Sequence, residues 1–232
     1  MNRQTTILKY LIILVLFILV IYCYKSGLIE SFIPSSVQSG NVYTVEVNRH
    51  GGYRSQLKSI VNQLFPAGSN VSDLEKYQVL HDFVIEYFSY DYDAYKRASK
   101  TNNMSSLSEA NKVENCFVLQ KGVCGAYAYF YEDLCETAGL RCDYVSGYAN
   151  FLDSKNISHA WNAVYLNGKC YHVDVCWDDT GAGEYEFFIR GNNYININKA
   201  QFRTWSHNCP FSEEGISRNK IKTDIEVTVV VR

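Results

Sequence analysis

The residue whose position most clearly suggests chemistry is Cys124, which opens a predicted helix in the stretch GVCGAYAYFYEDLCETAGL. The first N–H groups of a helix have no intrahelical partner, and together with the helix dipole they stabilise a thiolate. The thiolate is the nucleophilic form of cysteine, so this position favours a lowered pKa of the thiol. Gly122 permits an unusual backbone and close approach of a substrate, and Gly125 leaves the helix entry open. The pattern predicts an activated sulfur.

A histidine and a carboxylate are predicted to meet on a β-hairpin further along the chain. Asn167-Gly168 is the strongest turn signal, and a two-residue turn there pairs Leu166 with Lys169. Side chains alternate along a strand, so this register places His159 and Asp174 on one face, diagonally about 7–8 Å apart at the backbone. An imidazole and a carboxylate can bridge that gap. A histidine oriented by an acid, together with a thiolate, is what nucleophilic catalysis requires.

The second strand of this hairpin also permits a metal site as a rival interpretation. Cys170, His172, Asp174 and Cys176 occupy alternate positions, so all four would project from one face. At roughly 3.3 Å per residue they span about 20 Å, whereas bonds to zinc are only about 2.0–2.3 Å long. One zinc ion would reach two of them at most. We therefore expect no metal and no cofactor.

Each candidate residue also has a purely structural interpretation. Cys124 alone would be read as a half-cystine in a chain with eight cysteines, and His159 alone as a surface residue at the start of a strand. Asp174 is harder to explain in this way, because a lone carboxylate within an apolar strand needs a partner. The combination favours chemistry at these three positions.

The hydrophobic pattern predicts helices first and strands after them. Helices are predicted over 53–65, from Ser72 to about Phe88, and from Cys124 to Gly139, with a polar, mostly irregular segment over 91–113. The predicted strands are 42–47, 141–149, 160–166, 169–177, 184–189 and 225–231. This order predicts the α+β class with a mostly antiparallel sheet.

Several of these stretches resemble the transglutaminase-like superfamily. The segments GVCGAYAYFYEDLCETAGL, YVSGYA and SHAWNAVYLNGKCYHVDVCWDD follow its G-V-C helix start and its V-x-G-Y-A, H-A-W-N and D-x-x-W strands. The resemblance is strongest over Gly122–Asp179 and extends from Ser72 to about Pro210. It implies a papain-like core, in which N-terminal helices and the helix of the nucleophile pack on an antiparallel β-sheet.

The resemblance also implies roles for individual residues. Cys124 matches the family's nucleophile, His159 its general base and acid, and Asp174 the acid that orients the histidine. The thiolate would attack an acyl carbon and form a thioester, which water hydrolyses or an amine intercepts. The candidates for the oxyanion partner and the cleft walls are Tyr90, Tyr92 and Trp161.

Three functions remain open at this point. Short single-domain members of the family look more often like peptidases or amidases, so hydrolysis of peptide or protein acyl groups is the first expectation. The second is acyl transfer from protein glutamine to an amine, and the third is a non-catalytic binding or scaffold module on the same fold. A formal net charge of −2 provides no basic footprint, so we expect a peptide or protein substrate and no nucleic acid.

The N-terminal part of the chain predicts a membrane anchor. Residues 7–26 contain YLIILVLFILVIYCY, an uncharged run that approaches the roughly 17–25 residues of a membrane helix. A cleaved signal peptide is the alternative, although no small-residue cleavage site follows the run. Arg3 and Lys9 precede the apolar core and only Lys25 follows it, which predicts a cytoplasmic segment at 1–6 and a domain outside the cytoplasm.

We therefore expect a single-pass membrane protein with an extracytoplasmic catalytic domain. Residues 27–41 form the predicted stalk, 42–71 an N-terminal extension and 72–232 the transglutaminase-like domain. Of the eight cysteines, Cys23 falls in the anchor and one thiol is expected to be free, which leaves six for disulfides in an oxidising compartment. Six cysteines allow fifteen pairings, and the sequence does not choose among them.

Overall fold

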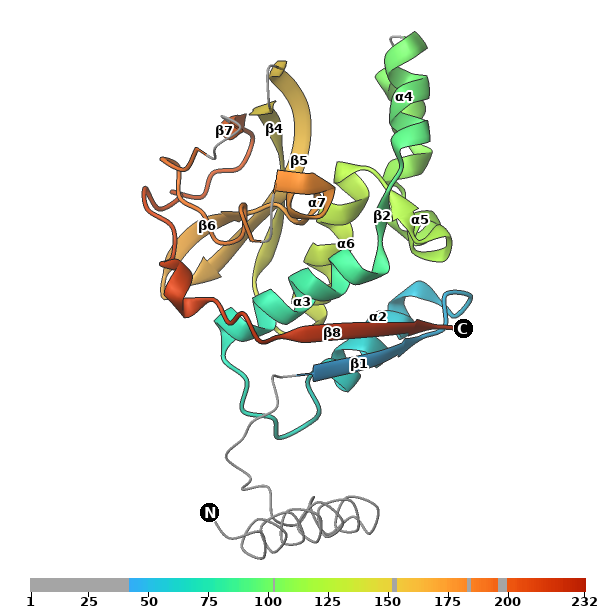
Figure 1. The fold of residues 1–232 in the computed structure, drawn as a ribbon, viewed down its shortest axis with the longest axis vertical. Helices are drawn as coiled ribbons and strands as arrows, with labels where there is room; N and C mark the ends of the chain where they lie inside the picture. Colours follow the sequence, from blue (N-terminus) through green and yellow to red (C-terminus); the bar gives the residue numbers. More distant parts are fainter. Residues whose placement is uncertain (1–41, 102, 152–153, 183–184, 196–199) are drawn as a thin grey trace, which may run out of the picture. The chain divides into compact units, whose positions relative to one another are not determined.

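The computed structural model describes residues 42–101, 103–151, 154–182, 185–195 and 200–232. Within them the helices are α2 (Tyr53–Leu64), α3 (Asp73–Tyr87), α4 (Tyr92–Thr101), α5 (Val113–Leu119), α6 (Cys124–Thr137) and α7 (Val175–Trp177). Short helical turns lie at η1 (Met104–Leu107), η2 (Glu109–Asn111), η3 (Asp178–Ala182) and η4 (Arg218–Lys220). The strands are β1 (Val42–Val47), β2 (Ser89–Tyr90), β3 (Lys121–Gly122), β4 (Cys142–Phe151), β5 (Ser154–Leu166), β6 (Lys169–Val173), β7 (Gln201–Trp205) and β8 (Glu226–Val231). This is a mixed α/β fold with a curled antiparallel sheet (Figure 1).

The predicted helices α2, α3 and α6 are confirmed. α2 buries one apolar face, formed by Leu57, Ile60, Val61 and Leu64. α3 begins after Ser72, whose hydroxyl oxygen accepts a hydrogen bond from the backbone N–H of Glu75 at 3.3 Å. α6 ends at Thr137 and is followed by Gly139 at a φ of +77°, the left-handed residue that commonly stops a helix. Both α2 and α3 pack against α6, so the helix that begins at Cys124 is central to the core.

The four-stranded sheet has the order β6-β5-β4-β7, and α6 packs on it through β4 and β5. The hairpin between β5 and β6 has the predicted register, with Leu166 opposite Lys169. Asn167 and Gly168 both have positive φ, 52° and 74°, as the tight turn of such a hairpin requires. The turn residues therefore determine which side chains of the two strands meet.

Three predicted segments differ from the observed elements. The strand predicted over 169–177 ends at Val173, because Asp174 caps the short helix α7 instead of continuing the ladder. The strand predicted over 184–189 is wrong: the residues described there are irregular, although Phe187 and Phe188 are fully buried. A short apolar run can be buried both as a strand and as an irregular segment, so the hydrophobic pattern could not distinguish the two conformations. The segment over 91–113, predicted as mostly irregular, contains α4, which buries only the small side chains of Ala94 and Ala98.

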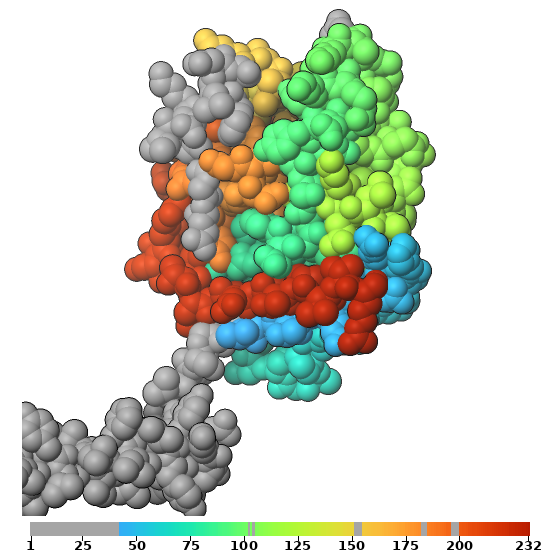
Figure 2. All heavy atoms as spheres, turned by 45° about the vertical axis from the view of Figure 1, so that its right-hand side comes forward, coloured from blue at the N-terminus to red at the C-terminus, as the bar shows by residue number. Residues whose placement is uncertain are grey.

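Strand β1 pairs in parallel with the C-terminal strand β8, from Val42 opposite Glu226 to Val47 opposite Val231. Figures 1 and 2 show β8 (red) running beside β1 (blue) along one edge of the domain. α2 packs on β1 and α3 packs on β8. Residues 42–71, expected as an extension, thus contribute a strand and a helix to the compact unit Val42–Arg232.

The expected anchor at 7–26, the segment 1–6 and the stalk at 27–41 lie outside the described residues. In the part of the chain that is described, no helix is both long enough and apolar enough to cross a bilayer.

The expectation of six paired cysteines is wrong for the described residues. There, Cys170 and Cys209 form a disulfide, with their Cα atoms 6.4 Å apart. The cysteines at positions 116, 124, 135, 142 and 176 are free thiols. Four of them are buried among apolar side chains, where cysteine behaves as a small hydrophobic residue.

Gly147 in β4 is predicted to tolerate no side chain. A Cβ at this position would lie 2.0 Å from the backbone oxygen of Thr204 in β7 and 2.8 Å from the ring of Trp161. We expect Gly147→Ala to lower the free energy of unfolding by about 1–3 kcal/mol, measured by urea denaturation, because the backbone of β7 must shift. Gly52→Ala is the control, since the nearest atom there is 3.6 Å away. Equal effects of the two substitutions would contradict the close approach of β4 and β7.

Candidate active site

Cys124 is the first residue of α6, and Val123 before it provides no side-chain cap. The first N–H groups of the helix therefore have no side-chain acceptor, and they lie beside the sulfur. Gly122 does not have the unusual backbone that we expected, since its φ is not positive. Its small size is what matters: a Cβ there would lie 2.6 Å from the Cβ of Ala126 and 3.2 Å from the sulfur of Cys116. Gly122 thus lets β3 run directly into the start of α6.

His159 on β5 and Asp174 at the end of β6 are in direct contact. Nε2 of His159 lies 2.5 Å from Oδ2 of Asp174, and the side chains are 4% and 1% exposed. The second carboxylate oxygen, Oδ1, accepts the backbone N–H of Trp177 at 3.0 Å. The indole of Trp177 then stacks on the imidazole, with ring centres 4.4 Å apart. One carboxylate therefore orients the histidine and also caps the helix that carries the ring packed on it.

The imidazole of His159 also interacts with the sulfur of Cys124, and each group shifts the pKa of the other. Because Nε2 is occupied by Asp174, the nitrogen that faces the sulfur is Nδ1. Burial alone raises the pKa of the Cys124 thiol, but the bond and charge of His159, with a hydrogen bond from the backbone of Ala160, lower it below its usual value. Burial likewise lowers the pKa of His159, but the charge and bond of Asp174, then Cys124, raise it to about 10. Both shifts favour a thiolate–imidazolium pair at neutral pH.

Cys124 and His159 lie at the wall of a cleft of about 660 Å³. One side of the cleft is formed by Tyr90 and Tyr92, before and at the start of α4, and the other by residues of β4 and β5. The backbone of Val123 and Gly125 lines it beside the sulfur. The thiolate is therefore accessible to a ligand, although most of its surroundings are protein.

Residues 61–175 match the family model described as the transglutaminase-like superfamily. This segment contains Cys124, His159 and Asp174. The chain belongs to the transglutaminase-like superfamily.

Two curated relatives are similar to this transglutaminase-like chain. The kyphoscoliosis peptidase of Mus musculus is 27% identical over 178 residues, which are 72% of this chain and 24% of that protein. The kyphoscoliosis peptidase of Homo sapiens is 27% identical over 187 residues, 78% of this chain and 25% of that protein. The chain therefore spans about a quarter of the length of these relatives.

Two solved structures are similar to about half of this chain. One is a transglutaminase (TGase), with a TM-score of 0.42 and 18% identity, covering 53% of this chain and 30% of that one. The other is a proposed cysteine protease from Cytophaga hutchinsonii, with a TM-score of 0.39 and 20% identity, covering 53% of this chain and 37% of that one.

The transglutaminase-like domain brings five of the six candidate residues to one place. Cys124, His159 and Asp174 are in contact as described, and Tyr90 and Tyr92 line the cleft.

Trp161, expected at the cleft wall, does not line the cleft. It is 1% exposed, its ring stacks on Phe202 at 4.6 Å, and its indole N–H donates to Nδ1 of His172 at 3.0 Å. Trp177 packs against His159 instead. The sequence could have indicated this position of Trp177, because Asp174 lies three residues before it, which is the spacing between a helix-capping residue and the N–H that it accepts.

The rival metal site is not assembled. Cys170 is in a disulfide, His172 is held between Trp161 and Asn192, and Asp174 binds His159. Among the described residues no three His, Cys, Asp or Glu side chains are grouped as metal ligands.

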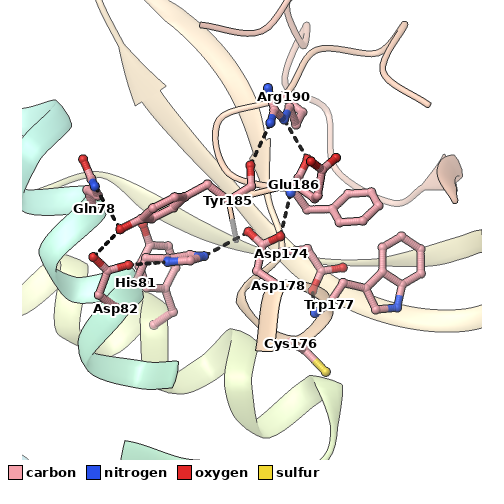
Figure 3. Close-up of polar contacts among 12 residues, drawn as sticks. Gln78, His81, Asp82, Asp174, Cys176, Trp177, Asp178, Tyr185, Glu186 and Arg190 are labelled. Carbon is pink, nitrogen blue, oxygen red and sulfur yellow. Dashed lines mark hydrogen bonds and ion pairs between the residues drawn. The ribbon is translucent and has the colours of Figure 1, made fainter. Parts of the chain in front are cut away.

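A second buried histidine, which the sequence did not reveal, lies behind the site (Figure 3). Nδ1 of His81 on α3 lies 2.9 Å from Asp82, and Nε2 lies 3.0 Å from Asp178. Burial lowers the pKa of His81, but the bonds to Asp178 and Asp82 outweigh it and raise it to about 9. Burial raises the pKa of Asp178 to about 6, although His81 opposes this. Between these two values the pair is imidazolium and carboxylate.

This pair is connected by hydrogen bonds to the loop of Asp174. Oδ1 of Asp178 accepts the backbone N–H of Phe187 at 2.7 Å, and the backbone N–H of Asp174 donates to the oxygen of Phe187 at 3.0 Å. The backbone N–H of Asp178 also donates to the oxygen of Asp174 at 3.2 Å. α3 is thereby tied to α7, the helix that carries Trp177.

The ion pair predicts how alkylation of Cys124 depends on pH. In the wild type, iodoacetamide should modify Cys124 well below the usual thiol pKa of 9.0, because His159 stabilises the thiolate. In His159→Gln the stabilising bond and charge are lost while burial remains. We expect the rate at neutral pH to fall at least about tenfold and the midpoint to move above 9.0, measured by mass spectrometry of the Cys124 peptide.

Cys124→Ser is the control that identifies the modified residue in this experiment. An unchanged midpoint in His159→Gln would contradict the ion pair.

The His81 contacts predict a pH-dependent part of stability. The folded pKa of about 9 exceeds the usual 6.5, so this contribution is complete below about pH 6.5 and is lost as pH rises to about 9. Its upper limit is about 3.5 kcal/mol, because the pKa of His81 rises from 6.5 to about 9 and each tenfold change in an equilibrium constant corresponds to about 1.4 kcal/mol. His81→Gln should therefore lose the part of the pH slope between 6.5 and 9 that the wild type has in urea denaturation.

His50→Gln, at an exposed histidine, is the matched control and should keep the wild-type slope. A wild-type slope in His81→Gln would mean that His81 is neutral in the folded protein.

Proposed function

We propose that the protein is a cysteine hydrolase, which forms a thioester between Cys124 and an acyl group of a peptide or protein and transfers that group to water. The observation that carries this proposal is that Cys124 and His159 line one open cleft and shift each other's pKa, with Asp174 bonded to Nε2 of the imidazole. Membership of the transglutaminase-like superfamily supports the same chemistry. The peptidase names of the two relatives agree with it.

The first half-reaction follows from the protonation states. The thiolate of Cys124 attacks the acyl carbon, and a tetrahedral oxyanion forms. As the C–N bond breaks, the imidazolium of His159 donates its Nδ1 proton to the leaving amine, and the acyl group remains as a thioester. Asp174 keeps Nδ1 directed at the sulfur and stabilises the positive ring, as the acid of a triad does.

The second half-reaction reverses these roles. Neutral His159 removes a proton from water, the resulting hydroxide attacks the thioester, and the C–S bond breaks to release a carboxylic acid. The thiolate and the imidazolium are regenerated, so no proton is gained or lost by the site.

Two donors are available for the oxyanion. The backbone N–H of Cys124 is the first of α6 and has no intrahelical acceptor. The hydroxyl of Tyr90 lines the same cleft, and burial raises its pKa, which keeps it protonated as a donor. Tyr92 packs edge-on against the ring of Tyr90 at 4.8 Å and supports its position.

A location outside the cytoplasm is proposed with this function. The disulfide between Cys170 and Cys209 is the kind of bond that persists in oxidising compartments. The uncharged apolar run within 7–26 supports a membrane anchor, because its length approaches that of a membrane-spanning helix.

Substitution of the proposed nucleophile tests the function. With a library of N-acetyl peptide amides, we expect Cys124→Ala to abolish product formation, since the other thiol at the cleft, Cys176, is buried and burial raises its pKa. Asp174→Asn should retain the fold but lose at least about a hundredfold in kcat, because the histidine loses its orienting charge. Cys116→Ala, at a buried thiol outside the cleft, is the control and should keep wild-type turnover.

The acceptor is identified in the same assay by adding a fluorescent primary amine. Free carboxylic acid as the main product supports hydrolysis. Incorporation of the amine in excess of hydrolysis would instead make the protein an acyltransferase. Wild-type turnover by Cys124→Ala would refute both and leave a binding module.

A further inference from the structure

The cleft contains many aromatic rings and no charged side chains apart from its reactive pair. Of its lining residues, none is Asp, Glu, Lys or Arg. Five are tyrosines, at positions 90, 92, 95, 144 and 148, and Trp177 is a sixth aromatic residue. Such a composition is informative in a chain of which 20% is charged, because a random stretch of surface would carry several charges.

The rings differ in how firmly they are held. Tyr90 is packed against Tyr92 and Tyr95, with ring centres 4.8 and 6.3 Å away. Tyr144 stacks on Tyr129 at 4.2 Å with nearly parallel planes. These contacts fix the inner rings as rigid surfaces.

Two outer rings remain exposed on opposite walls. Tyr92, at the start of α4, is 61% exposed, and Tyr148, on β4, is 53% exposed. α4 and β4 rise on separate sides of the domain in Figure 1, and both contribute to the same cleft. Neither hydroxyl forms a hydrogen bond with another described residue, so both rings are available to a ligand.

These surroundings discriminate between ligand side chains on simple physical grounds. An aromatic side chain that enters the cleft buries apolar area and gains ring–ring contacts on either wall. A charged side chain loses hydration there and finds no charged side chain on the walls outside the pair of Cys124 and His159, whose charges already neutralise each other. The volume of about 660 Å³ lies within the roughly 300–1,000 Å³ of sites that enclose one compact ligand, which restricts selection to the few groups beside the reacting acyl carbon.

We propose that the acyl donor is a peptide segment with an aromatic side chain beside the acyl group that Cys124 attacks and without charged side chains in the cleft, and that Tyr92 and Tyr148 select it. This inference rests on the proposed function for its chemistry. The selection itself is a property of binding and does not require turnover.

Binding to the Cys124→Ala protein tests the selection without catalysis. The probes are matched N-acetyl peptide amides that differ at one position, with Phe, Leu, Glu or Lys, and the measurement is calorimetric or fluorescence titration. We expect the Phe peptide to bind most tightly and the Glu and Lys peptides at least about tenfold more weakly, because a charge is desolvated without a partner. Equal affinity for the Phe and Glu peptides would overturn the inference, whether or not the wild type turns any peptide over.

Variants of the two outer rings, also made in the Cys124→Ala protein, assign the selection to them. Tyr92→Ala and Tyr148→Ala should each weaken binding of the Phe peptide by roughly three- to tenfold, the contribution of one aromatic pair, and leave the Glu peptide unchanged. Tyr92→Phe and Tyr148→Phe keep the ring and should retain full selectivity. Leu119→Ala, at a side chain that is 70% exposed outside the cleft, is the control and should change nothing.

In the active protein Tyr148→Ala should raise KM for the Phe peptide with little change in kcat, since this ring acts in binding. Alkylation of Cys124 by iodoacetamide should keep its wild-type rate. Loss of selectivity in the Tyr→Phe variants would overturn the role of the rings. If the Phe peptide binds selectively but yields no Cys124-dependent product, the proposed function fails while the selection stands.

Discussion

The contact between His159 and Asp174 is the interaction on which the site depends. Both side chains are almost completely removed from water, and an isolated buried charge costs several kcal/mol. The structure compensates by using every atom of the carboxylate: one oxygen bonds the imidazole, and the other accepts the backbone N–H of Trp177. The positive ring in turn requires the thiolate of Cys124 on its free nitrogen. Removing any one of these groups leaves another charge buried without a partner, so geometry and protonation state are specified together.

The groups of the site come from two differently built halves of the domain. The helical half contributes Cys124 at the first turn of α6, and the sheet contributes His159 from the middle of β5. Asp174 lies where the sheet ends, and a second ionic pair, His81 with Asp178, connects that point back to α3. The hydrogen bonds of the Phe187 backbone to Asp178 and Asp174 therefore connect the helical half with the sheet a second time. A site assembled across two layers keeps its geometry only while such cross-connections hold.

The features of the fold and of the site that could be predicted from the sequence are those that are determined by residues close together in the chain. The hairpin could be predicted because Asn167 and Gly168 determine its register by themselves, and the helix start at Cys124 follows from adjacent residues. The meeting of His159 with Asp174 was predicted for a strand, although Asp174 caps a helix, because both geometries bring the side chains to the same side of β5. His81 and Asp178 are 97 positions apart, and no periodicity links them. Trp161 was assigned to the cleft because it lies two residues from His159 on the same face of β5, but its indole stacks on Phe202, bonds His172 and is buried there.

The pairing of β1 with β8 has a mechanical consequence. The strands are parallel, so the chain enters the ladder at Val42 and leaves it beyond Val231, at the opposite end. The backbone N–H of Arg232 bonds the oxygen of Val47, which extends the ladder by one more link. Tension between these two points would act along the strands, and all the evenly spaced hydrogen bonds of the ladder would share the load at once. The tensile load would pass through β1 and β8 and bypass the walls of the cleft until this small sheet ruptured.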